Sequence, residues 1–378
     1  MPTDIKSLTR GELEAQFKLW KQPAYRITQL LEWLYVRHAT AWDTMTNLPE
    51  KLRAQLQENY SLQGLELVRK QGSLDITQKF LWKLADGAFI ESVLIPANPA
   101  LYGEASDRHT LCVSTQVGCA YGCKFCASGL DGWKRNLAPN EIVEQVLAIE
   151  RLNDVENRKL PVEGRRPESD KSSILPRLIN NLVIMGMGEP LANYENLLKA
   201  LRILNAPWGG GIGARKITIS TSGLVPQIRR LADEPEQFRL AISPHGATDE
   251  VRQRIMPVNR KYPLKELTAA LEYYQGQKDR MITFEYILIA DVNDAVEQTR
   301  PLAALARHLR AKVNLIPYNK VEGLKWERPG EKVQETFLAA LEKQKISATL
   351  RREKGHDIDA ACGQLRLQTE KELRGGPV

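Results

Sequence analysis

The segment CVSTQVGCAYGCKFCASG (residues 112–129) holds four of the five cysteines of this 378-residue chain, and we expect it to decide the fold. Cys119, Cys123 and Cys126 have the spacing C-x3-C-x2-C, which lets three thiolates converge from one loop. A structural zinc site would need a fourth ligand and usually shows paired C-x2-C spacing. Three thiolates on a [4Fe–4S] cluster instead leave one iron open to a small molecule. The spacing therefore favours an open-site iron–sulfur cluster over zinc or inert thiols.

After residue 109, apolar strands alternate with amphipathic helices. The predicted strands are 110–116, 180–187, 216–222, 238–245, 281–289 and 312–319, and the predicted helices are 140–154, 194–206, 224–233, 264–277, 295–310 and 331–344. Continuous apolar strands alternating with helices indicate a parallel sheet covered on its faces. Six such units are fewer than the eight of a closed barrel, so we predict an α/β fold with a partial (β/α)6 barrel. Its reactive groups should lie at the C-terminal ends of the strands.

Polar residues follow several of these predicted strands. In VIMGMGEP (183–190), Gly188 lets the backbone approach a ligand, and the Glu189 carboxylate can accept from an ammonium group. Further candidates are Ser220, Ser243, His245 and Asn319, each at or just past a strand end. Taken singly, each is more readily explained as a turn or cap residue. Together, at successive strand ends, they predict a ligand site.

The first hundred residues differ from the rest. Residues 5–60 are predicted to be helical, with helices over 25–38 and 50–60 separated by Leu48-Pro49. QKFLWKLADGAFIESVLIP (78–96) predicts two strands that turn at Asp86-Gly87. Glu91 shares a strand face with apolar residues, so it either lies on an edge or pairs with a cation, or it is a desolvated acid–base group.

Composition sets broader limits. The chain has 53 Lys and Arg against 46 Asp and Glu, a net charge of +7 and a pI near 9.0, compatible with RNA binding but not specific for it. No apolar run reaches the ~18–20 residues of a membrane helix, and the N-terminus lacks a signal peptide's apolar core. We therefore expect a soluble, cytosolic protein without disulfide staples. Residues 155–176 are predicted to form an insertion loop that either touches RNA or is merely solvated.

The cysteine motif, with Phe125 before its last cysteine, resembles that of the radical S-adenosylmethionine (SAM) superfamily. The wider run CVSTQVGCAYGCKFCASG, then KRNL, MGMGEP, STSG, PYN and DIDAACGQL, resembles the RlmN/Cfr family of RNA methyltransferases over nearly the whole chain. The resemblance implies three parts: an N-terminal helical domain (1–62), a β-strand extension (63–105) and a radical SAM barrel (106–378). A loop in this last part carries Cys362.

The resemblance also implies the chemistry. Cys119, Cys123 and Cys126 would hold the [4Fe–4S] cluster, and the SAM contacts would be Gly188, Glu189, Ser220, Ser243, Pro244, His245 and Asn319. Pro244 replaces the leucine usual at its position. Two SAM molecules would serve each turnover, one methylating Cys362 and one generating the radical. Cys112 would then attack the sulfur of Cys362 to form a transient disulfide, and Glu91 would accept the proton from the target carbon.

The implied product is adenosine methylated at C2, in 23S rRNA and in tRNA, with an external flavodoxin- or ferredoxin-like electron donor and a monomeric enzyme. Three alternatives stay open: methylation at C8 as in the Cfr group, an iron–sulfur RNA-binding protein without turnover, and an enzyme that makes a glycyl radical on another protein. Neither of the last two needs Cys112, Cys362 and Glu91 together.

Overall fold

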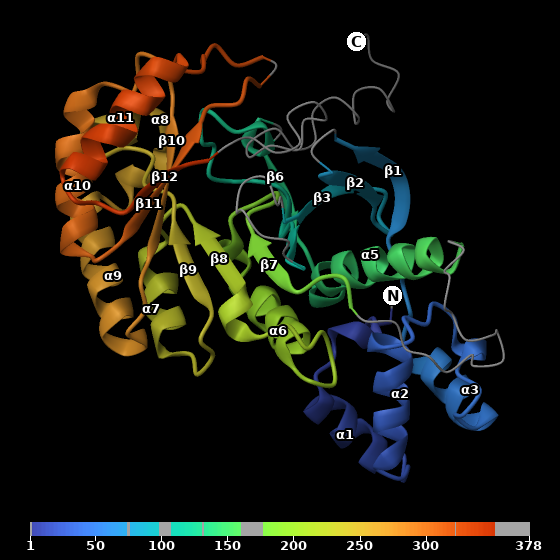
Figure 1. The fold of residues 1–378 in the computed structure, drawn as a ribbon. Helices are drawn as coiled ribbons and strands as arrows, with labels where there is room; N and C mark the ends of the chain where they lie inside the picture. The colour runs from blue at the N-terminus through green and yellow to red at the C-terminus, as the bar shows by residue number, and fades with distance from the viewer. Residues whose placement is uncertain are drawn as a thin grey trace.

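The fold is taken from a computed structural model (Figure 1). It describes residues 2–73, 76–97, 107–130, 132–159, 177–321 and 323–351. Within these residues one ten-stranded sheet runs through the molecule in the order β1-β2-β3-β4-β7-β8-β9-β10-β11-β12. A separate two-stranded sheet, β5-β6, lies beside it.

The barrel part of the large sheet is entirely parallel. Its strands are β4 (His109–Cys112), β7 (Asn181–Ile184), β8 (Ile217–Thr221), β9 (Arg239–Ile242), β10 (Thr283–Leu288), β11 (Lys312–Pro317) and β12 (Ala348–Leu350). Five of the six predicted strands and the parallel arrangement are confirmed, and the predicted strand 110–116 is confirmed only in its first part, as β4. The strand β12, paired with β11, is an addition that its three residues were too few to signal.

Helices cover the outer face of this sheet (Figure 1). They are α5 (Pro139–Lys159), α6 (Tyr194–Asn205), α7 (Val225–Asp233), α8 (Asp249–Ile255), α9 (Leu264–Lys278), α10 (Thr299–His308) and α11 (Glu331–Lys343). Helix α8 was not predicted. The predicted loop 155–176 is wrong at its start, because α5 continues through Lys159. The segment VENRK (155–159) is charged but contains no Gly or Pro, so nothing in it stops a helix. The rest of that loop lies outside the described residues.

Three antiparallel strands extend the barrel sheet on the β4 side. They are β1 (Glu66–Gly72), β2 (Gln78–Lys83) and β3 (Phe89–Pro96), and β3 pairs antiparallel with β4. The turn at Asp86-Gly87 is confirmed, with Gly87 at a φ of +81°. Strand β1 was missed because ELVRKQG is largely exposed and lacks a clear alternation. The extension places β3, which carries Glu91, directly beside the first barrel strand.

The predicted strand 110–116 is divided in two. Strand β4 ends at Cys112, and Gln116–Gly118 forms β5, which pairs antiparallel with β6 (Trp133–Asn136). Because β5 and β6 flank the cysteine loop, they close it at its base.

The N-terminal module has helices α1 (Arg10–Leu19), α2 (Tyr25–Tyr35) and α3 (Glu50–Asn59), as predicted. Helix α2 buries Ile27, Leu30, Leu31, Leu34 and Tyr35, at the spacing of one helical face. This module contacts α5 through a buried ion pair, with Lys6 Nζ 2.8 Å from a Glu144 carboxylate oxygen. The module is therefore fixed against the barrel.

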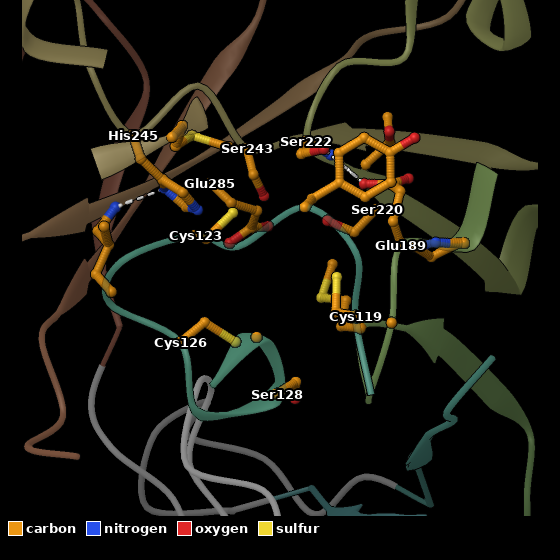
Figure 2. Close-up of a pocket in the computed structure, with 18 of the residues that line it drawn as sticks. Cys119, Cys123, Cys126, Ser128, Glu189, Ser220, Ser222, Ser243, His245 and Glu285 are labelled. Atoms are coloured by element: carbon orange, nitrogen blue, oxygen red, sulfur yellow. Dashed lines mark hydrogen bonds between the residues drawn. The ribbon is translucent and has the colours of Figure 1, made fainter. Parts of the chain in front are cut away.

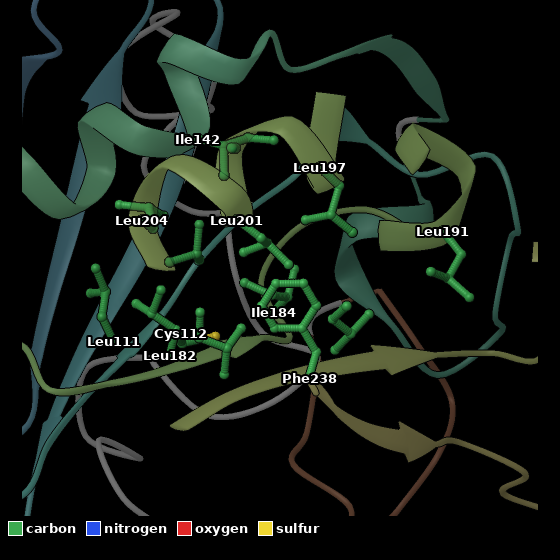
Figure 3. Packing of buried hydrophobic residues seen from close by; sticks show 14 of the residues in the cluster. Leu111, Cys112, Ile142, Leu182, Ile184, Leu191, Leu197, Leu201, Leu204 and Phe238 are labelled. Carbon is green, nitrogen blue, oxygen red and sulfur yellow. The ribbon is translucent and has the colours of Figure 1, made fainter. Parts of the chain in front are cut away.

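Apolar side chains from the strands and from α5 and α6 form one core (Figure 3). Leu111, Leu182 and Ile184 meet Leu197 and Leu201 there, all completely buried. Cys112 belongs to the same cluster and is 8% exposed. In the described part of the chain, no helix has both the length and the hydropathy needed to cross a bilayer.

Candidate functional site

The three cysteines of the C-x3-C-x2-C motif lie on the loop between β5 and the short helix η3 (Ala127–Gly129) (Figure 2). The backbone N–H of Cys126 donates to the carbonyl of Cys123 over 3.1 Å, which curls the loop. Gly122 has a φ of +56°, and a Cβ on Gly129 would lie 3.3 Å from the Cα atom of Gly122. Glycine at both positions therefore lets the loop fold back on itself.

Two contacts fix this loop to the barrel. The backbone N–H of Lys124 donates to the carbonyl of Ile255, at the end of α8, over 2.9 Å. The indole N–H of Trp326 donates to the carbonyl of Lys124 over 2.7 Å. The loop is thus held from two sides, in a place where its thiols face a common space.

The three cysteines are half-buried. Burial raises the pKa of Cys119 to about 12, and it raises the pKa of Cys123 well above the usual value of a thiol. The nearby Cys126 raises both values further. Such thiols stay protonated until a cation replaces the proton, as metal ligation does. The donor set therefore suits a metal cluster.

The arrangement does not suit a single metal ion. Across the described ranges, no three His, Cys, Asp or Glu side chains are grouped so as to hold one. The ligands of a [4Fe–4S] cluster each bind a different iron, so they need not meet at one point. The three thiols facing one cavity fit a cluster better than they fit zinc.

The loop after β7 comes very close to the chain that follows β4. A Cβ on Gly186 would lie 2.7 Å from the Ser114 amide nitrogen. Gly188 has a φ of +101°, and a Cβ there would lie 2.5 Å from Cβ of Gln116. The Gln116 side-chain oxygen accepts from the backbone N–H of Glu189 over 2.8 Å. Glycine is required at both positions, and the close approach aims Glu189 at the cysteine loop.

The Glu189 carboxylate is buried and already holds several hydrogen bonds. It accepts from the backbone N–H and the hydroxyl of Ser222, over 2.8 and 2.7 Å, and from the backbone N–H of Leu191 over 3.1 Å. Burial raises the pKa of Glu189, and the donors from Ser222 oppose that rise. The carboxylate is held rigidly at the cavity wall.

His245 follows β9 with a φ of +52°. Its Nδ1 accepts from the backbone N–H of Ile287 over 3.1 Å, so the ring proton is on Nε2. Burial lowers the pKa of His245 to about 3, with the charge of Arg252 as a second cause. The ring is therefore neutral at pH 7, and Phe125 packs edge-on against it with centroids 4.9 Å apart.

A single cavity joins these groups (Figure 2). The predicted residues that line it are Cys119, Cys123, Cys126, Gly188, Glu189, Ser220, Ser243 and His245. Two other predicted contacts, Pro244 and Asn319, are buried but are not among the lining residues.

The predicted catalytic residues lie elsewhere. Glu91 is completely buried on β3, with its carboxylate 3.5 Å from Lys79 Nζ. Of the predicted alternatives for Glu91, pairing with a cation is confirmed. Cys112 is the last residue of β4, opposite Val93 of β3. Cys362, and with it any pairing with Cys112, lies outside the described residues.

Sequence reasoning missed three polar residues of the site. Ser222 holds Glu189, Arg252 donates to Ser222, and Glu285 lines the cavity from β10 while accepting from the Asn314 amide over 2.7 Å. Glu285 could have been found, because it interrupts the apolar run FEYILI just as Glu91 interrupts FIESVLI. Arg252 carried no such signal, since it lies in the charged stretch DEVRQR.

Comparisons with known proteins show the family of this chain. Residues 3–62 match the ribosomal RNA large subunit methyltransferase N-terminal domain, and residues 174–302 match the radical SAM superfamily. The chain is 52% identical to a probable dual-specificity RNA methyltransferase RlmN 3 of Opitutus terrae, over 96% of this chain and 94% of that protein. It is 51% identical to a probable dual-specificity RNA methyltransferase RlmN of Akkermansia muciniphila, over 93% and 92%.

A solved structure agrees as well. The crystal structure of a radical SAM methyltransferase from Sphaerobacter thermophilus is 42% identical, with a TM-score of 0.85. The match covers 97% of this chain and 99% of that one.

Proposed function

Because this chain belongs to the RlmN family of radical SAM RNA methyltransferases, we propose that it methylates C2 of adenosine in 23S rRNA and in tRNA. The observation that carries the proposal is the cavity in which three thiols of one loop face Glu189, Ser220, Ser243 and His245. The names of the relatives support two RNA substrates. They leave the target carbon open, so the C2 position rests on the family resemblance of the motifs.

The residues lining the cavity have separate tasks. Cys119, Cys123 and Cys126 would hold the [4Fe–4S] cluster. Glu189 would accept from the ammonium group of SAM, while the neutral His245 presents an Nε2–H donor to the cavity. When bound, the reduced cluster and SAM supply radical chemistry able to take a hydrogen from an unactivated methyl group.

Two half-buried serines complete the lining on the SAM side. Ser220 lies in β8 and Ser243 directly follows the adjacent β9, and the backbone N–H of Ser243 donates to the carbonyl of Thr221 over 2.9 Å, which fixes their spacing. Their hydroxyls suit the ribose and the amino-acid carboxylate of SAM. Asn319 and Pro244 would contact SAM at the edge of this set. Pro244 has no backbone N–H, so this chain has one donor fewer there than a relative with leucine.

Methylation at C2 requires a residue that carries the methyl carbon from SAM to the RNA. C2 of adenine is an electrophilic carbon between two nitrogens, with no lone pair to attack the methyl group of SAM. We propose that Cys362 receives a methyl group from one SAM and, after loss of a hydrogen, adds that carbon to C2. A second SAM is consumed in removing the hydrogen, which makes two per turnover.

Release of the product falls to Glu91 and Cys112. Glu91 would take the proton from C2, and the unpaired electron left by the addition would return to the oxidised cluster, so that the adduct is a closed-shell thioether. The Cys112 thiolate would then attack the sulfur of Cys362, so that a sulfur–sulfur bond forms while the sulfur–carbon bond to the RNA breaks. The electron pair of the broken bond goes to the carbon, which takes up a proton and becomes the methyl group. An external thiol reduces the disulfide before the next cycle.

The RNA and the remaining partners follow from this scheme. The target adenine must leave its stack to reach the cavity, at a cost of a few kcal/mol. The net charge of +7 suits a polyanionic substrate. An external flavodoxin- or ferredoxin-like protein would supply electrons one at a time. The enzyme would be a monomer and would act in the cytoplasm, where these RNAs reside.

One experiment tests the proposal. The cluster is reconstituted without oxygen, and the enzyme is given SAM, a reductant and unmethylated 23S rRNA fragment or tRNA. The digested nucleosides are compared by mass spectrometry with authentic 2-methyl- and 8-methyladenosine. We expect 2-methyladenosine from both RNAs. An 8-methyladenosine product would place the chain with the Cfr group, and 5′-deoxyadenosine without any methylated adenosine would overturn the assigned substrate.

A further inference from the structure

A completely buried arginine lies behind the SAM side of the cavity. Arg252 belongs to α8 and has no exposed surface. Its Nη2 donates to the Ser222 carbonyl over 2.6 Å, and its Nη1 donates to the Asn259 side-chain oxygen over 2.5 Å and to the Tyr262 carbonyl over 3.0 Å. The guanidinium thus connects three segments of the chain at one point.

One glycine makes room for the guanidinium. Gly223, with a φ of +111°, would bring a Cβ to 3.1 Å from Arg252 Nη2. A second glycine, Gly246, lets the backbone of α8 come close, since a Cβ there would lie 2.4 Å from the Arg252 backbone nitrogen.

In the part of the chain that the structure describes, this guanidinium has no carboxylate partner at hydrogen-bond distance. Its three acceptors there are neutral oxygens, and its Nε is buried without a hydrogen-bond partner among the same residues. Burial lowers the pKa of Arg252 to about 10, so the group is still cationic at pH 7. A buried cation without an ion pair is unfavourable, which indicates that a negative group completes its surroundings.

The helix of Arg252 contacts the cysteine loop directly. The backbone N–H of Lys124, the residue after Cys123, donates to the carbonyl of Ile255 at the end of α8 over 2.9 Å. A [4Fe–4S] core with three thiolate ligands carries net negative charge, and it becomes more negative on reduction. The cluster would therefore supply the missing counter-charge.

We infer that Arg252 is a positioning residue with two effects: it fixes Ser222 and through it the Glu189 carboxylate, and its charge favours the reduced state of the cluster bound by Cys123. The inference deepens the proposed function and rests on the cluster assigned there. The first effect follows from continuous contacts, since Arg252 holds the Ser222 carbonyl while the N–H and hydroxyl of Ser222 hold Glu189. The second follows because a nearby positive charge stabilises the state with the extra electron.

Two substitutions separate the effects. Arg252→Met keeps much of the side-chain volume but loses the charge and the donors, so both effects should disappear. Arg252→Lys keeps the charge but replaces the planar fork by one ammonium group, which cannot span Ser222 and Asn259 as the guanidinium does. Arg254, exposed on the same helix, provides the matched control Arg254→Met.

The readouts do not depend on RNA methylation. Iron and sulfide content show whether each variant holds its cluster. A redox titration followed by electron paramagnetic resonance gives the midpoint potential of that cluster. Calorimetry gives the Kd for SAM. We expect the cluster of Arg252→Met to have a more negative midpoint potential than that of the parent. We also expect the Kd for SAM to rise about tenfold or more, the size expected when one charge-assisted hydrogen bond is lost. Arg252→Lys should keep the potential close to that of the parent yet also bind SAM more weakly.

An unchanged potential and an unchanged Kd in Arg252→Met would overturn the inference, whatever nucleoside the parent produces. Should Arg252→Met not fold, Arg252→Gln against Arg252→Lys gives the same comparison of charge lost and charge kept. Failure of the proposed function looks different, because the parent enzyme would then hold a cluster and bind SAM without forming 2-methyladenosine.

Discussion

Lys79 Nζ lies 3.5 Å from Oε1 of Glu91, and the two side chains are only 6% and 1% exposed. A carboxylate this deeply buried needs a counter-charge, and the ammonium group on β2 provides it. The pair sits beside the first barrel strand, since β3 lines up with β4 at Val93 and Cys112.

The first prediction concerns Glu91. Glu91→Gln should abolish formation of 2-methyladenosine, because the amide cannot take the proton from C2, while SAM is still cleaved to 5′-deoxyadenosine. Both products are measured in one reaction by chromatography and mass spectrometry. Glu66→Gln removes a carboxylate from an exposed pair with Lys83 on the neighbouring strands, and it should leave both products unchanged. Full methylation by Glu91→Gln would exclude Glu91 as the base.

The second prediction concerns Glu189. Glu189→Gln keeps the shape of the side chain but removes its charge, so the Kd for SAM should rise about tenfold or more through loss of a charge-assisted hydrogen bond. Calorimetry on the cluster-loaded enzyme measures it. Glu195→Gln, whose side chain is 76% exposed on α6, is the control and should bind SAM as the parent does. Equal affinity in Glu189→Gln would remove Glu189 from the SAM site.

A third prediction separates the two cysteines outside the cluster motif. Cys362→Ala should lose methylation and form no covalent species with RNA, since no methyl carrier remains. Cys112→Ala should instead accumulate enzyme joined covalently to RNA, because nothing breaks the sulfur–carbon bond. A denaturing gel resolves this species, and ribonuclease treatment shifts it. Free methylated RNA released in repeated turnovers by Cys112→Ala would refute the role of Cys112.

A fourth prediction concerns the N-terminal module. Glu144→Ala leaves the buried Lys6 without its ion-pair partner, and it should lower the free energy of unfolding by about 3–5 kcal/mol. The exposed pair of Arg10 and Glu14 offers a control, and Glu14→Ala should change this free energy by about 1 kcal/mol or less. Denaturant unfolding followed by circular dichroism gives both values. Equal effects of the two substitutions would show that the buried pair does not stabilise this contact.

Much of the fold was predictable because its signals are local. The apolar strands and amphipathic helices repeat along the chain, and Asp86-Gly87 specifies its turn within a few residues. The cysteine spacing is likewise local, since one loop carries all three thiols. Residues at successive strand ends, such as Ser220 and Ser243, could be placed together because parallel strands end at the same edge.

Other features depend on contacts that the sequence does not show. Arg252 looks like one more charged residue of a surface helix, and its guanidinium is buried in space that Gly223 leaves free. Strand β12 has three residues and exists through its pairing with β11. The segment 155–176 predicts a loop through its Pro, Ser and charged residues, but α5 continues to Lys159 because nothing in residues 155–159 interrupts a helix.

The central claim is that the methyl carbon reaches RNA through Cys362, and isotope tracing tests it most directly. The enzyme is given SAM with a trideuterated methyl group, and the 2-methyladenosine formed over many turnovers is analysed by mass spectrometry. Relay through Cys362 removes one deuterium before the carbon joins RNA and adds one proton from solvent at release. The account therefore predicts a product methyl group with two deuterium atoms. A product that keeps all three would show direct transfer from SAM and would contradict the account.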